Sequence, residues 1–375
     1  MNNVSSSNSQ KALVPELRFP EFRDDLKQSK LSDISVYKTK RATDVKSHYV
    51  STENLLQNCM GIVPYTDKTA IDGISFSIND ILLGNIRPYL KKAWLAEFDG
   101  VCSTDVLVLH PLKIEPSYFK YLICRDKFFT YAMSSAKGSK MPRGDKAFIM
   151  DMTISLPSIN EQKKLASMLM LIDTLISKQE KLVDELKLYK RGVISTLNCT
   201  ALECHEIAVG NVFSITRGNV LATGNISPIK TEKFCYPVYS SQTKNDGLLG
   251  YYSDYLYEDA ITWTTDGANA GYTKFRKGKF YCTNVCGVLI NNDGYANNYV
   301  AELINSISKK YVSYVGNPKL MNNVMAEVKI NLPNIENQEF FSRTISLIDS
   351  KISKECSILN SLLMTKNALL QKMFI

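Results

Sequence analysis

The chain is poor in several features that whole classes of proteins require. Its 375 residues include three histidines and two tryptophans, and no two of its twelve prolines are adjacent. No segment approaches the roughly 18 consecutive apolar residues of a membrane helix, and the polar N-terminus lacks the apolar core of a secretory leader. We therefore expect a cytoplasmic protein without a membrane segment, whose nine scattered cysteines stay reduced and pack as small apolar residues.

The same scarcity argues against metal binding and catalysis. Cys282 and Cys286 are close in sequence, as are Cys199, Cys204 and His205, but neither group has a second set of ligands at zinc-site spacing. An adenine methyltransferase needs an Asn/Asp-Pro-Pro-aromatic loop to hold a flipped base, and this chain has no adjacent prolines. The sequence therefore predicts no metal site and no catalytic residues, and so a protein that is not an enzyme.

What the chain does have is an excess of basic residues. Lysine and arginine number 45 against 37 aspartates and glutamates, for a net charge of +8. This balance is compatible with a polyanionic partner such as DNA. A mildly basic protein with no nucleic-acid role fits the composition equally well, so the charge alone does not decide between them.

The most informative feature is an internal duplication. The segment Ile154–Gln162 (ISLPSINEQ) returns 176 residues later as Ile330–Gln338 (INLPNIENQ), and the match continues without a gap into Leu171-Ile172-Asp173 and Leu347-Ile348-Asp349. A period this long exceeds that of a solenoid and predicts a duplicated domain followed by a helix. We divide the chain into a disordered tail (1–20), a first domain (21–158), a central helix (159–198), a second domain (199–332) and a C-terminal helix (333–375).

Each repeated segment opens a long helix with a heptad pattern. Each helix runs for roughly 36 residues, or about 54 Å at 1.5 Å per residue, a length typical of a coiled coil. The first seam consists of Leu165, Leu169, Ile172, Ile176, Gln179, Val183, Leu186, Lys190, Val193 and Leu197. The second consists of Phe341, Ile345, Ile348, Ile352, Glu355, Leu359, Leu362, Lys366, Leu369 and Met373. Alternating spacings of four and three predict that the helices supercoil around each other.

Polar layers at matching positions of both seams indicate how the helices pair. An antiparallel pair places Lys190 opposite Glu355 and Gln179 opposite Lys366, whereas a parallel pair sets Lys190 against Lys366. Because like charges at a seam are unfavourable, we predict antiparallel helices. In the alternative, both lysines extend their charged ends into solvent. The nuclease-like string Asp184-Glu-Leu-Lys187 lies on the first helix, where we expect a solvated face.

The two globular domains have the composition of mixed α/β folds. Short apolar runs bounded by Gly, Pro, Asn and Asp predict strands in both. In the first domain these are Ile74–Ile78, Ile81–Leu83 and Val106–Leu109, and in the second Tyr236–Tyr239, Ala260–Trp263 and Phe280–Thr283. One helix is predicted in each, at Tyr118–Met133 and Tyr299–Tyr311. The expected fold class is α+β: two similar mixed α/β domains separated by two long antiparallel coiled-coil helices, with pseudo-twofold symmetry.

Several of these segments together resemble a known family, the specificity subunits of type I restriction–modification systems. The resemblance covers essentially the whole chain, and the order of the segments and the duplication carry it. The segments are Leu17–Phe22, Asn79–Lys92, Gly138–Arg143, Tyr236–Ser241 followed by Gly247–Tyr252, and the twin Leu-Pro-x-Ile-x-x-Gln motifs.

The resemblance implies a function and a set of partners. It implies two target recognition domains, each reading one half of a bipartite double-stranded DNA site, and helices that dock two methyltransferase (modification) subunits. Restriction (translocase and endonuclease) subunits join such a core. The chain itself then needs no cofactor, while S-adenosylmethionine, ATP and Mg are expected on the partner subunits.

Basic, aromatic and amide side chains in predicted loops are the candidate DNA contacts. Arginine can pair with a guanine edge, asparagine and glutamine with adenine, and lysine with phosphate. In the first domain the candidates are Arg87, Tyr89, Lys91, Lys92, Lys140 and Arg143. In the second they are Gln242, Lys244, Asn245, Thr265, Asn269, Asn317 and Lys319. The alternative is that these loops are ordinary polar turns on the surface.

Two other functions remain open at this point. A coiled-coil scaffold whose twin domains bind protein or another ligand would have the same architecture but a flat response to salt. A self-sufficient methyltransferase would transfer methyl groups as a purified chain.

Overall fold

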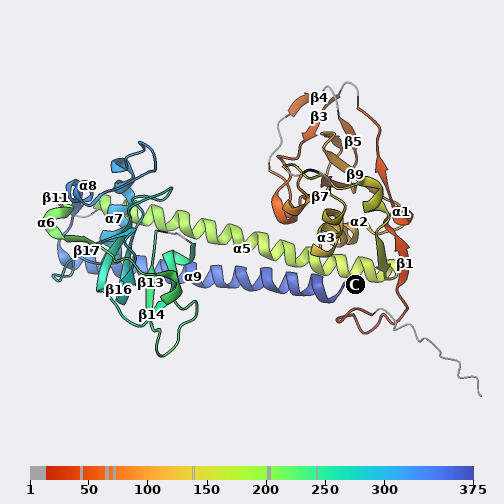
Figure 1. Ribbon diagram of the computed structural model, residues 1–375. Helices are drawn as coiled ribbons and strands as arrows, with labels where there is room; N and C mark the ends of the chain where they lie inside the picture. The colour runs from red at the N-terminus through yellow and green to blue at the C-terminus, as the bar shows by residue number, and fades with distance from the viewer. Residues whose placement is uncertain are drawn as a thin grey trace, which may run out of the picture. The chain divides into compact units, whose positions relative to one another are not determined.

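Two compact units make up the protein. The computed structural model describes residues 14–42, 45–63, 67–70, 73–136, 138, 140–200, 204–241 and 244–375. Unit 1 comprises residues 1–179 and 358–375, and unit 2 comprises residues 180–357. The long helices α5 (Ile159–Thr200) and α9 (Ile335–Lys372) each contribute one stretch to each unit (Figure 1). Their bounds lie close to the ranges predicted from the heptad pattern.

Unit 1 is built from two four-stranded sheets and a short strand pair. The first sheet has the order β2-β9-β6-β7 and is antiparallel throughout, and the second has the order β4-β3-β8-β5 with β3 and β8 parallel. The strands are β1 (Lys27–Lys30), β2 (Ser35–Lys38), β3 (Val45–Val50), β4 (Asp67–Ala70), β5 (Ile74–Phe76), β6 (Ile81–Gly84), β7 (Ala93–Leu95), β8 (Gly100–Cys102), β9 (Val106–Pro111) and β10 (Thr153–Leu156). The short helices are α1 (Leu31–Ile34), α2 (Pro116–Ile123), α3 (Asp126–Ser134), α4 (Lys146–Met150), η1 (Gln57–Cys59) and η2 (Pro88–Leu90).

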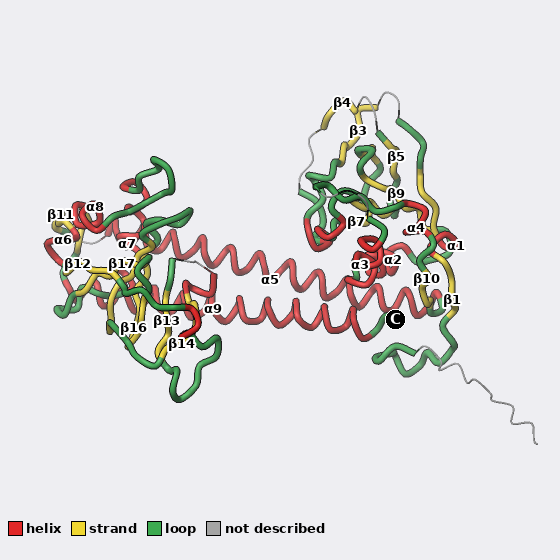
Figure 2. Tube along the Cα trace, viewed as in Figure 1, coloured by secondary structure: helices red, strands yellow, loops and turns green. Residues whose placement is uncertain are grey.

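Unit 2 joins its main strands into one six-stranded sheet of order β12-β17-β15-β16-β13-β14 (Figure 2). The strands are β11 (His205–Ala208), β12 (Ser214–Arg217), β13 (Tyr236–Tyr239), β14 (Leu248–Tyr252), β15 (Tyr257–Thr264), β16 (Thr273–Cys282), β17 (Cys286–Ile290) and β18 (Lys329–Leu332). The helices are α6 (Val209–Val212), α7 (Asn298–Ser308), α8 (Asn322–Glu327), η3 (Thr223–Asn225), η4 (Lys244–Gly247) and η5 (Lys309–Tyr311).

The two units share part of their topology, and their similar mixed α/β make-up with two long helices confirms the predicted fold class. In each, a short antiparallel pair, β1·β10 or β11·β18, leads into a long helix. The series β2-β9-β6 of unit 1 has its counterpart in β12-β17-β15 of unit 2, and a parallel pair follows in both, β3·β8 or β13·β16. The sequence repeat therefore corresponds to a structural repeat.

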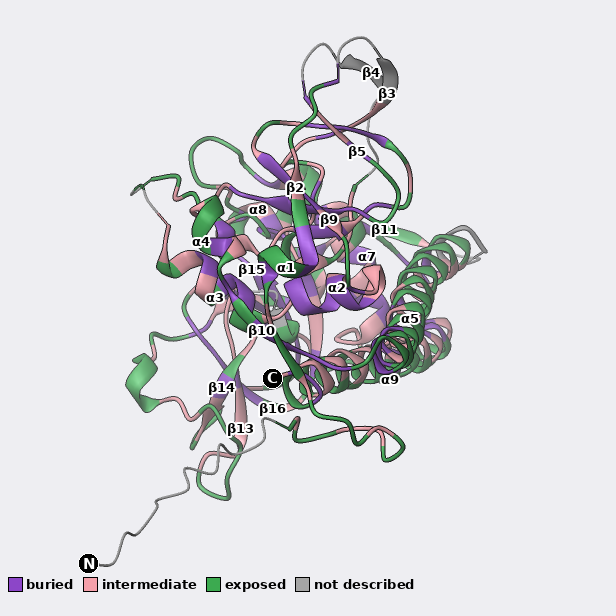
Figure 3. Ribbon diagram, turned by 90° about the vertical axis from the view of Figure 1, so that its right-hand side faces the viewer, coloured by how far each residue is buried: buried purple, intermediate pink, exposed green. Residues whose placement is uncertain are grey.

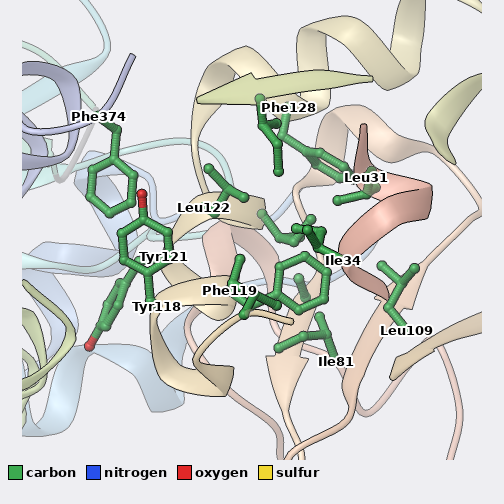
Figure 4. Packing of buried hydrophobic residues seen from close by; sticks show 14 of the residues in the cluster. Leu31, Ile34, Ile81, Leu109, Tyr118, Phe119, Tyr121, Leu122, Phe128 and Phe374 are labelled. Carbon is green, nitrogen blue, oxygen red and sulfur yellow. The ribbon is translucent and has the colours of Figure 1, made fainter. Parts of the chain in front are cut away.

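The predicted helix at Tyr118–Met133 is wrong in one respect, because it is two helices. Helix α2 ends at Ile123, and Arg125 adopts an extended backbone before α3 begins at Asp126. Tyr118, Phe119 and Leu122 from α2 and Phe128 from α3 all enter the core of unit 1 (Figure 4). A single straight helix would turn one of these apolar faces away from the core, so the break follows from burial.

The twin Leu-Pro-x-Ile-x-x-Gln motifs begin the long helices in the same way. The buried Gln162 side chain donates to the Pro157 carbonyl (2.9 Å) and accepts from the Glu115 amide (3.0 Å). Gln338 donates to the Pro333 carbonyl (2.8 Å) and accepts from the Asn297 side chain (3.3 Å). Each glutamine thus ties the start of a long helix to the start of α2 or α7, which explains why the motif occurs twice.

The segment Leu17–Phe22 fastens the ends of both long helices in unit 1. Arg18 makes two hydrogen bonds of 2.8 Å to the buried carboxylate of Glu161. The Leu17 amide donates to the Lys372 carbonyl (3.0 Å), and Lys164 lies over the Phe19 ring. These contacts assign the segment a structural role at the base of the helices.

The long helices run antiparallel within each unit, as predicted. In unit 1 the seam residues Leu165 and Leu169 of α5 share a core with Met373 at the end of α9. In unit 2 Ile194, near the end of α5, shares a core with Ile345 near the start of α9. Among the other predicted seam residues Ile176 and Glu355 are buried, and Ile172, Lys190, Ile348, Ile352 and Leu359 are half-buried. Figure 3 shows that exposed, half-buried and buried positions alternate along the long helices.

The predicted partners of the seam lysines are wrong. Lys190 pairs with Asp349 (2.7 Å) and with Glu302 of α7 (2.5 Å), and Lys366 pairs with Asp173 (2.6 Å). In both cases the carboxylate lies six residues before the position predicted for the partner, Glu355 or Gln179. The prediction considered only partners within the seam. Each lysine side chain instead extends out of the seam and pairs with an aspartate next to a seam residue of the other helix.

These two ion pairs are related by the sequence repeat. Asp173 corresponds to Asp349 and Lys366 to Lys190, and each pair receives a third polar group from the domain helix of its unit. The Tyr121 hydroxyl of α2 donates to Asp173 (2.8 Å), while Glu302 of α7 accepts from Lys190. We call these two clusters the polar nodes of unit 1 and unit 2. Each node joins α5, α9 and a domain helix.

Candidate nucleic-acid interface

Loop 85–92 and segment 140–144 of unit 1 are held together by their backbones. The Arg87 amide donates to the Pro142 carbonyl (2.8 Å), and Ile86 and Arg143 form an isolated β-bridge. The base of the loop is closed by bonds from the Gly84 amide to the Lys92 carbonyl (2.9 Å) and from the Asn85 amide to the Asp105 carbonyl (3.1 Å). Two sequence-predicted segments that lie far apart in the chain therefore meet at one surface.

Unit 2 repeats this framework at loop 265–272 and segment 313–319. The Gly267 amide donates to the Pro318 carbonyl (2.9 Å), and Asp266 and Lys319 form the equivalent β-bridge. The closing bonds run from the Thr264 amide to the Tyr272 carbonyl (2.9 Å) and from the Thr265 amide to the Val285 carbonyl (3.2 Å). Loops 85–92 and 265–272 therefore correspond position for position.

The two loops differ in the residues at their left-handed positions. In unit 2 these positions are Gly267 (φ +93°) and Gly271 (φ +84°). In unit 1 they are Arg87 and Lys91, both with φ +51°. Glycine adopts this conformation without strain, but a residue with a Cβ does so at a cost. Non-glycine residues in strained backbone are concentrated at functional sites.

The predicted residues of loop 85–92 lie in different environments. Arg87 is exposed, and its guanidinium has no ion pair or hydrogen bond within the part of the chain that the structure describes. Tyr89, at 51% exposure, is equally open. Lys91 pairs with Asp126 (2.5 Å), and Lys92 donates to the Thr52 carbonyl (2.6 Å). The two lysines therefore have intramolecular partners, whereas the arginine and tyrosine side chains have none among the residues that the structure describes.

The basic residues of segment 140–144 lie beside this loop. Lys140 and Arg143 are exposed, and Arg143 pairs with Asp105 at 3.1 Å. Both side chains of that pair are more than one-third exposed, so the pair is weak and screened. Arg143 can exchange Asp105 for a phosphate at little cost.

The predicted residues of unit 2 are only partly exposed. Asn269, Asn317 and Lys319 lie on the surface, and Lys319 is 3.9 Å from Asp266. Thr265 has 0% exposure, and its hydroxyl donates to the Val285 carbonyl (2.9 Å). This threonine supports the loop from beneath and presents no surface to DNA.

Loop 240–247 carries the remaining predicted residues. Asn245 is exposed with a left-handed backbone (φ +49°). Gln242 lies outside the described residues, and Lys244 lies in η4 with its side chain outside them. The loop is anchored by Asp246, which forms an ion pair with Lys274 (2.6 Å).

Sequence reasoning missed a projecting tip in unit 2. Ser313 and Lys319 pair with each other, and the turn between them leaves Tyr314 69% and Val315 92% exposed. Exposed apolar side chains at a loop tip are suited to contact a thymine methyl group or a base step. The signal available in the sequence was an aromatic and a β-branched residue directly before Gly316-Asn317.

The buried side chain of Arg276 in β16 supports the sheet of unit 2. The Arg276 guanidinium lies 3.8 Å from the centre of the Tyr239 ring and donates to the Thr262 hydroxyl (3.1 Å). Burial raises the pKa of Tyr239, and the positive charge of Arg276 opposes that rise. Because its side chain is buried, Arg276 stabilises the sheet that carries the loops.

The described residues contain no group of three or more His, Cys, Asp or Glu placed to hold a metal ion. No helix within the described ranges is long and apolar enough to cross a bilayer.

Comparison with known proteins finds relatives over both units. The family described as "Type I restriction modification DNA specificity domain" matches residues 24–188 and again residues 203–363. The N-terminus of a putative type I specificity subunit of Mycoplasma pneumoniae is 37% identical over 134 residues, which are 35% of this chain and 70% of that protein. The type I restriction enzyme MpnII specificity subunit of the same organism is 36% identical over 134 residues, 35% of this chain and 39% of that protein.

Solved structures match over nearly the whole chain. The crystal structure of the type I restriction–modification system S subunit from M. genitalium has a TM-score of 0.66 at 16% identity, covering 97% of this chain and 99% of that chain. A chain from a structure concerned with complex assembly and conformational transition of the type I R-M system has a TM-score of 0.52 at 14% identity, covering 94% and 98%. At such identities these matches establish the fold alone.

Proposed function

Because this chain belongs to the type I restriction–modification DNA specificity family, we propose that it selects the DNA sequence on which a methyltransferase and nuclease complex acts. Each unit reads one half of a bipartite site in double-stranded DNA. The observation that carries the proposal is the duplicated loop framework, which presents exposed basic, amide and aromatic side chains at equivalent places in both units.

The proposal assigns sequence reading to this chain and chemistry to its partners. Exposed Arg87 and Arg143 in unit 1 and Asn269 and Lys319 in unit 2 are suited to bind base edges and phosphates. Methyl transfer would take place on separate modification subunits that hold S-adenosylmethionine. ATP and Mg would bind to restriction subunits, and this chain would bind neither.

The long helices offer two similar apolar surfaces for two copies of one partner. Leu171 of α5 is 62% exposed, and its repeat equivalent Leu347 of α9 is 68% exposed. Three further exposed apolar pairs are related by the same repeat: Ile159 and Ile335, Leu182 and Ile358, and Leu188 and Met364. Exposed apolar side chains that recur at equivalent positions indicate protein contact. We propose that the exposed apolar residues of each unit dock one methyltransferase subunit. They are Ile159, Leu171, Ile358 and Met364 in unit 1, and Ile335, Leu347, Leu182 and Leu188 in unit 2.

Salt dependence separates DNA reading from the alternative of a protein-binding scaffold. The chain would be assembled with its methyltransferase subunits and titrated with fluorescent duplex DNA over a series of salt concentrations. Phosphate contacts predict that the logarithm of affinity falls linearly with the logarithm of salt concentration, with a slope of about −0.9 per neutralised phosphate. A flat response would refute DNA binding and support the scaffold.

Methylation mapping tests the function in the cell. Adenine methylation would be mapped genome-wide in cells with the chain, without it, and with it restored from a plasmid. A split motif that disappears on deletion and returns on restoration supports the proposal. An unchanged methylation pattern contradicts it. Methyl transfer by the purified chain alone would also contradict the division of labour.

A further inference from the structure

We infer that the half-site read by unit 1 contains a G·C pair recognised by Arg87, a contact that loop 265–272 of unit 2 does not make. This inference rests on the proposed function and goes further, because it names the base, the residue and the unit. It depends on the comparison between loop 85–92 and loop 265–272.

The backbone of the loop needs no side chain at the Arg87 position. The corresponding Gly267 makes the same backbone hydrogen bond to a proline carbonyl, at 2.9 Å against 2.8 Å for Arg87. Both residues have positive φ, which glycine adopts freely and arginine does not. An arginine therefore occupies a position where glycine gives the same loop with less strain. Its side chain must contribute something that the fold of the loop does not require.

The guanidinium of Arg87 is placed to contact a ligand. It is exposed and has no ion pair or hydrogen bond within the described residues, in contrast to Arg143 with Asp105, Lys91 with Asp126 and Lys92 with the Thr52 carbonyl. Its planar fork of N–H donors matches the O6 and N7 acceptors of guanine in the major groove. Among the basic residues of this surface, Arg87 combines a bidentate donor group with the lack of any partner for its guanidinium in the described ranges of the chain.

Unit 2 presents a different set of groups at the same place. Gly267 has no side chain, and the exposed groups around it are Asn269 and the tip residues Tyr314 and Val315. An amide favours adenine, and apolar groups favour the thymine methyl. The half-site of unit 2 therefore does not depend on an arginine–guanine contact from this loop.

The test replaces Arg87 with the residue that unit 2 already uses. Arg87→Gly, Arg87→Lys and wild-type chains would each be expressed with the methyltransferase subunits in cells that lack the native chain, and methylated motifs would be mapped. Arg23→Gly, which removes an exposed arginine elsewhere in unit 1, serves as the control. Affinity for duplexes with single base-pair changes would be measured on the assembled complexes.

The expected result is a motif relaxed at one G·C pair of one half-site. Arg87→Gly should reduce discrimination at that pair by roughly 5- to 150-fold, with the other half-site and the spacer unchanged. Arg87→Lys should relax the same pair, because an ammonium group lacks the bidentate fork. Arg23→Gly should leave the motif as in wild type.

Several results would overturn the inference while the proposed function stands. These are a motif unchanged by Arg87→Gly, relaxation at an A·T pair, or loss of methylation at all sites by Arg87→Gly but not by Arg23→Gly. The last result would identify a general affinity contact. If the wild-type chain directs no split motif, the proposed function fails and the inference fails with it, so the two failures are distinguishable.

Discussion

The carboxylate of Asp173 is surrounded by polar side chains from α2 and α9. It accepts from Lys366 (2.6 Å), from the Tyr121 hydroxyl (2.8 Å) and from Lys120 (3.4 Å). Burial alone would raise the pKa of Asp173, but the hydrogen bond and positive charge of Lys366 outweigh it, so its pKa lies below the ordinary value. The carboxylate is therefore charged and stabilising in the folded protein.

Replacement of this carboxylate should destabilise the fold. Asp173→Asn keeps the size of the side chain but leaves Lys366 without its counter-charge, and we expect a loss of about 1–3 kcal/mol in unfolding free energy. Denaturant unfolding measures the difference. Asp184→Asn on the same helix is the control, since Asp184 is exposed and pairs with nearby Lys187, which is exposed as well. Equal effects of the two substitutions would contradict the role of the node.

The contribution of Asp173 should also depend on pH. A carboxyl group with a depressed folded-state pKa stabilises the protein above its unfolded pKa, and this stabilisation is lost as pH falls through the folded pKa. The stability difference between wild type and Asp173→Asn should be complete at about pH 7 and shrink below about pH 4. Unfolding curves over this range test the prediction. A difference that grows on acidification would refute it.

At the scale of elements, the two polar nodes have the same plan but opposite charge balance. In unit 1 the central carboxylate of Asp173 receives two lysines and a tyrosine. In unit 2 the central Lys190 joins two carboxylates, Glu302 and Asp349. Burial lowers the pKa of Lys190, but the charges and hydrogen bonds of Glu302 and Asp349 outweigh it and raise the pKa overall.

The two repeat-equivalent lysines should therefore differ in importance. Lys190→Met leaves two acidic groups facing each other, whereas Lys366→Met leaves Asp173 with Lys120 and Tyr121. We expect Lys190→Met to cost about 1–3 kcal/mol and Lys366→Met to cost less. Denaturant unfolding of the two variants under the same conditions measures both losses. A larger loss of unfolding free energy for Lys366→Met than for Lys190→Met would show that the charge balance around each lysine does not determine how much its node stabilises the protein.

Helices with a regular apolar period could be predicted from the sequence, whereas side-chain contacts that fall outside that period could not. The heptads located both long helices, because burial imposes a period that the sequence displays. Their antiparallel direction was predicted instead from the like charges that a parallel pair would place at the seam. The partners of Lys190 and Lys366 were missed because a flexible side chain reaches residues outside the seam. The break at Arg125 was missed because only the core shows that both α2 and α3 must face it.

The same distinction holds for the candidate interface. The sequence repeat, extended upstream at the same offset of 176 residues, aligns Pro142-Arg143 with Pro318-Lys319, and the structure places each pair beside the predicted loop. The burial of Thr265 and the exposure of Tyr314 and Val315 depend on how the turns fold back on the sheet. Single-sequence patterns do not contain that information.

At the scale of the whole molecule, the repeat should determine how many partner subunits bind. Leu171→Asp and Leu347→Asp each place a charge in one of the two proposed docking surfaces. Loss of a buried leucine contact is worth roughly 1.5–3 kcal/mol, so each variant should retain one methyltransferase subunit and the double variant none. Native mass spectrometry of the reconstituted complex counts the subunits.

The control for this experiment is Asn360→Asp, which adds a charge at an exposed polar position of α9. This variant should bind two methyltransferase subunits, as wild type does. Two subunits on the double variant would show that partners dock elsewhere.

In each polar node, the aspartate of one sequence repeat meets the lysine of the other. A change of one member of a pair leaves the charge of the other member unbalanced, so the two halves of the chain depend on each other at these positions. A chimera that takes one half from a homologue will keep both nodes only if the donor supplies the same aspartate and lysine. These four side chains lie on the long helices and outside the candidate loops 85–92 and 265–272, so they restrict which halves can be combined whatever the loop sequences are.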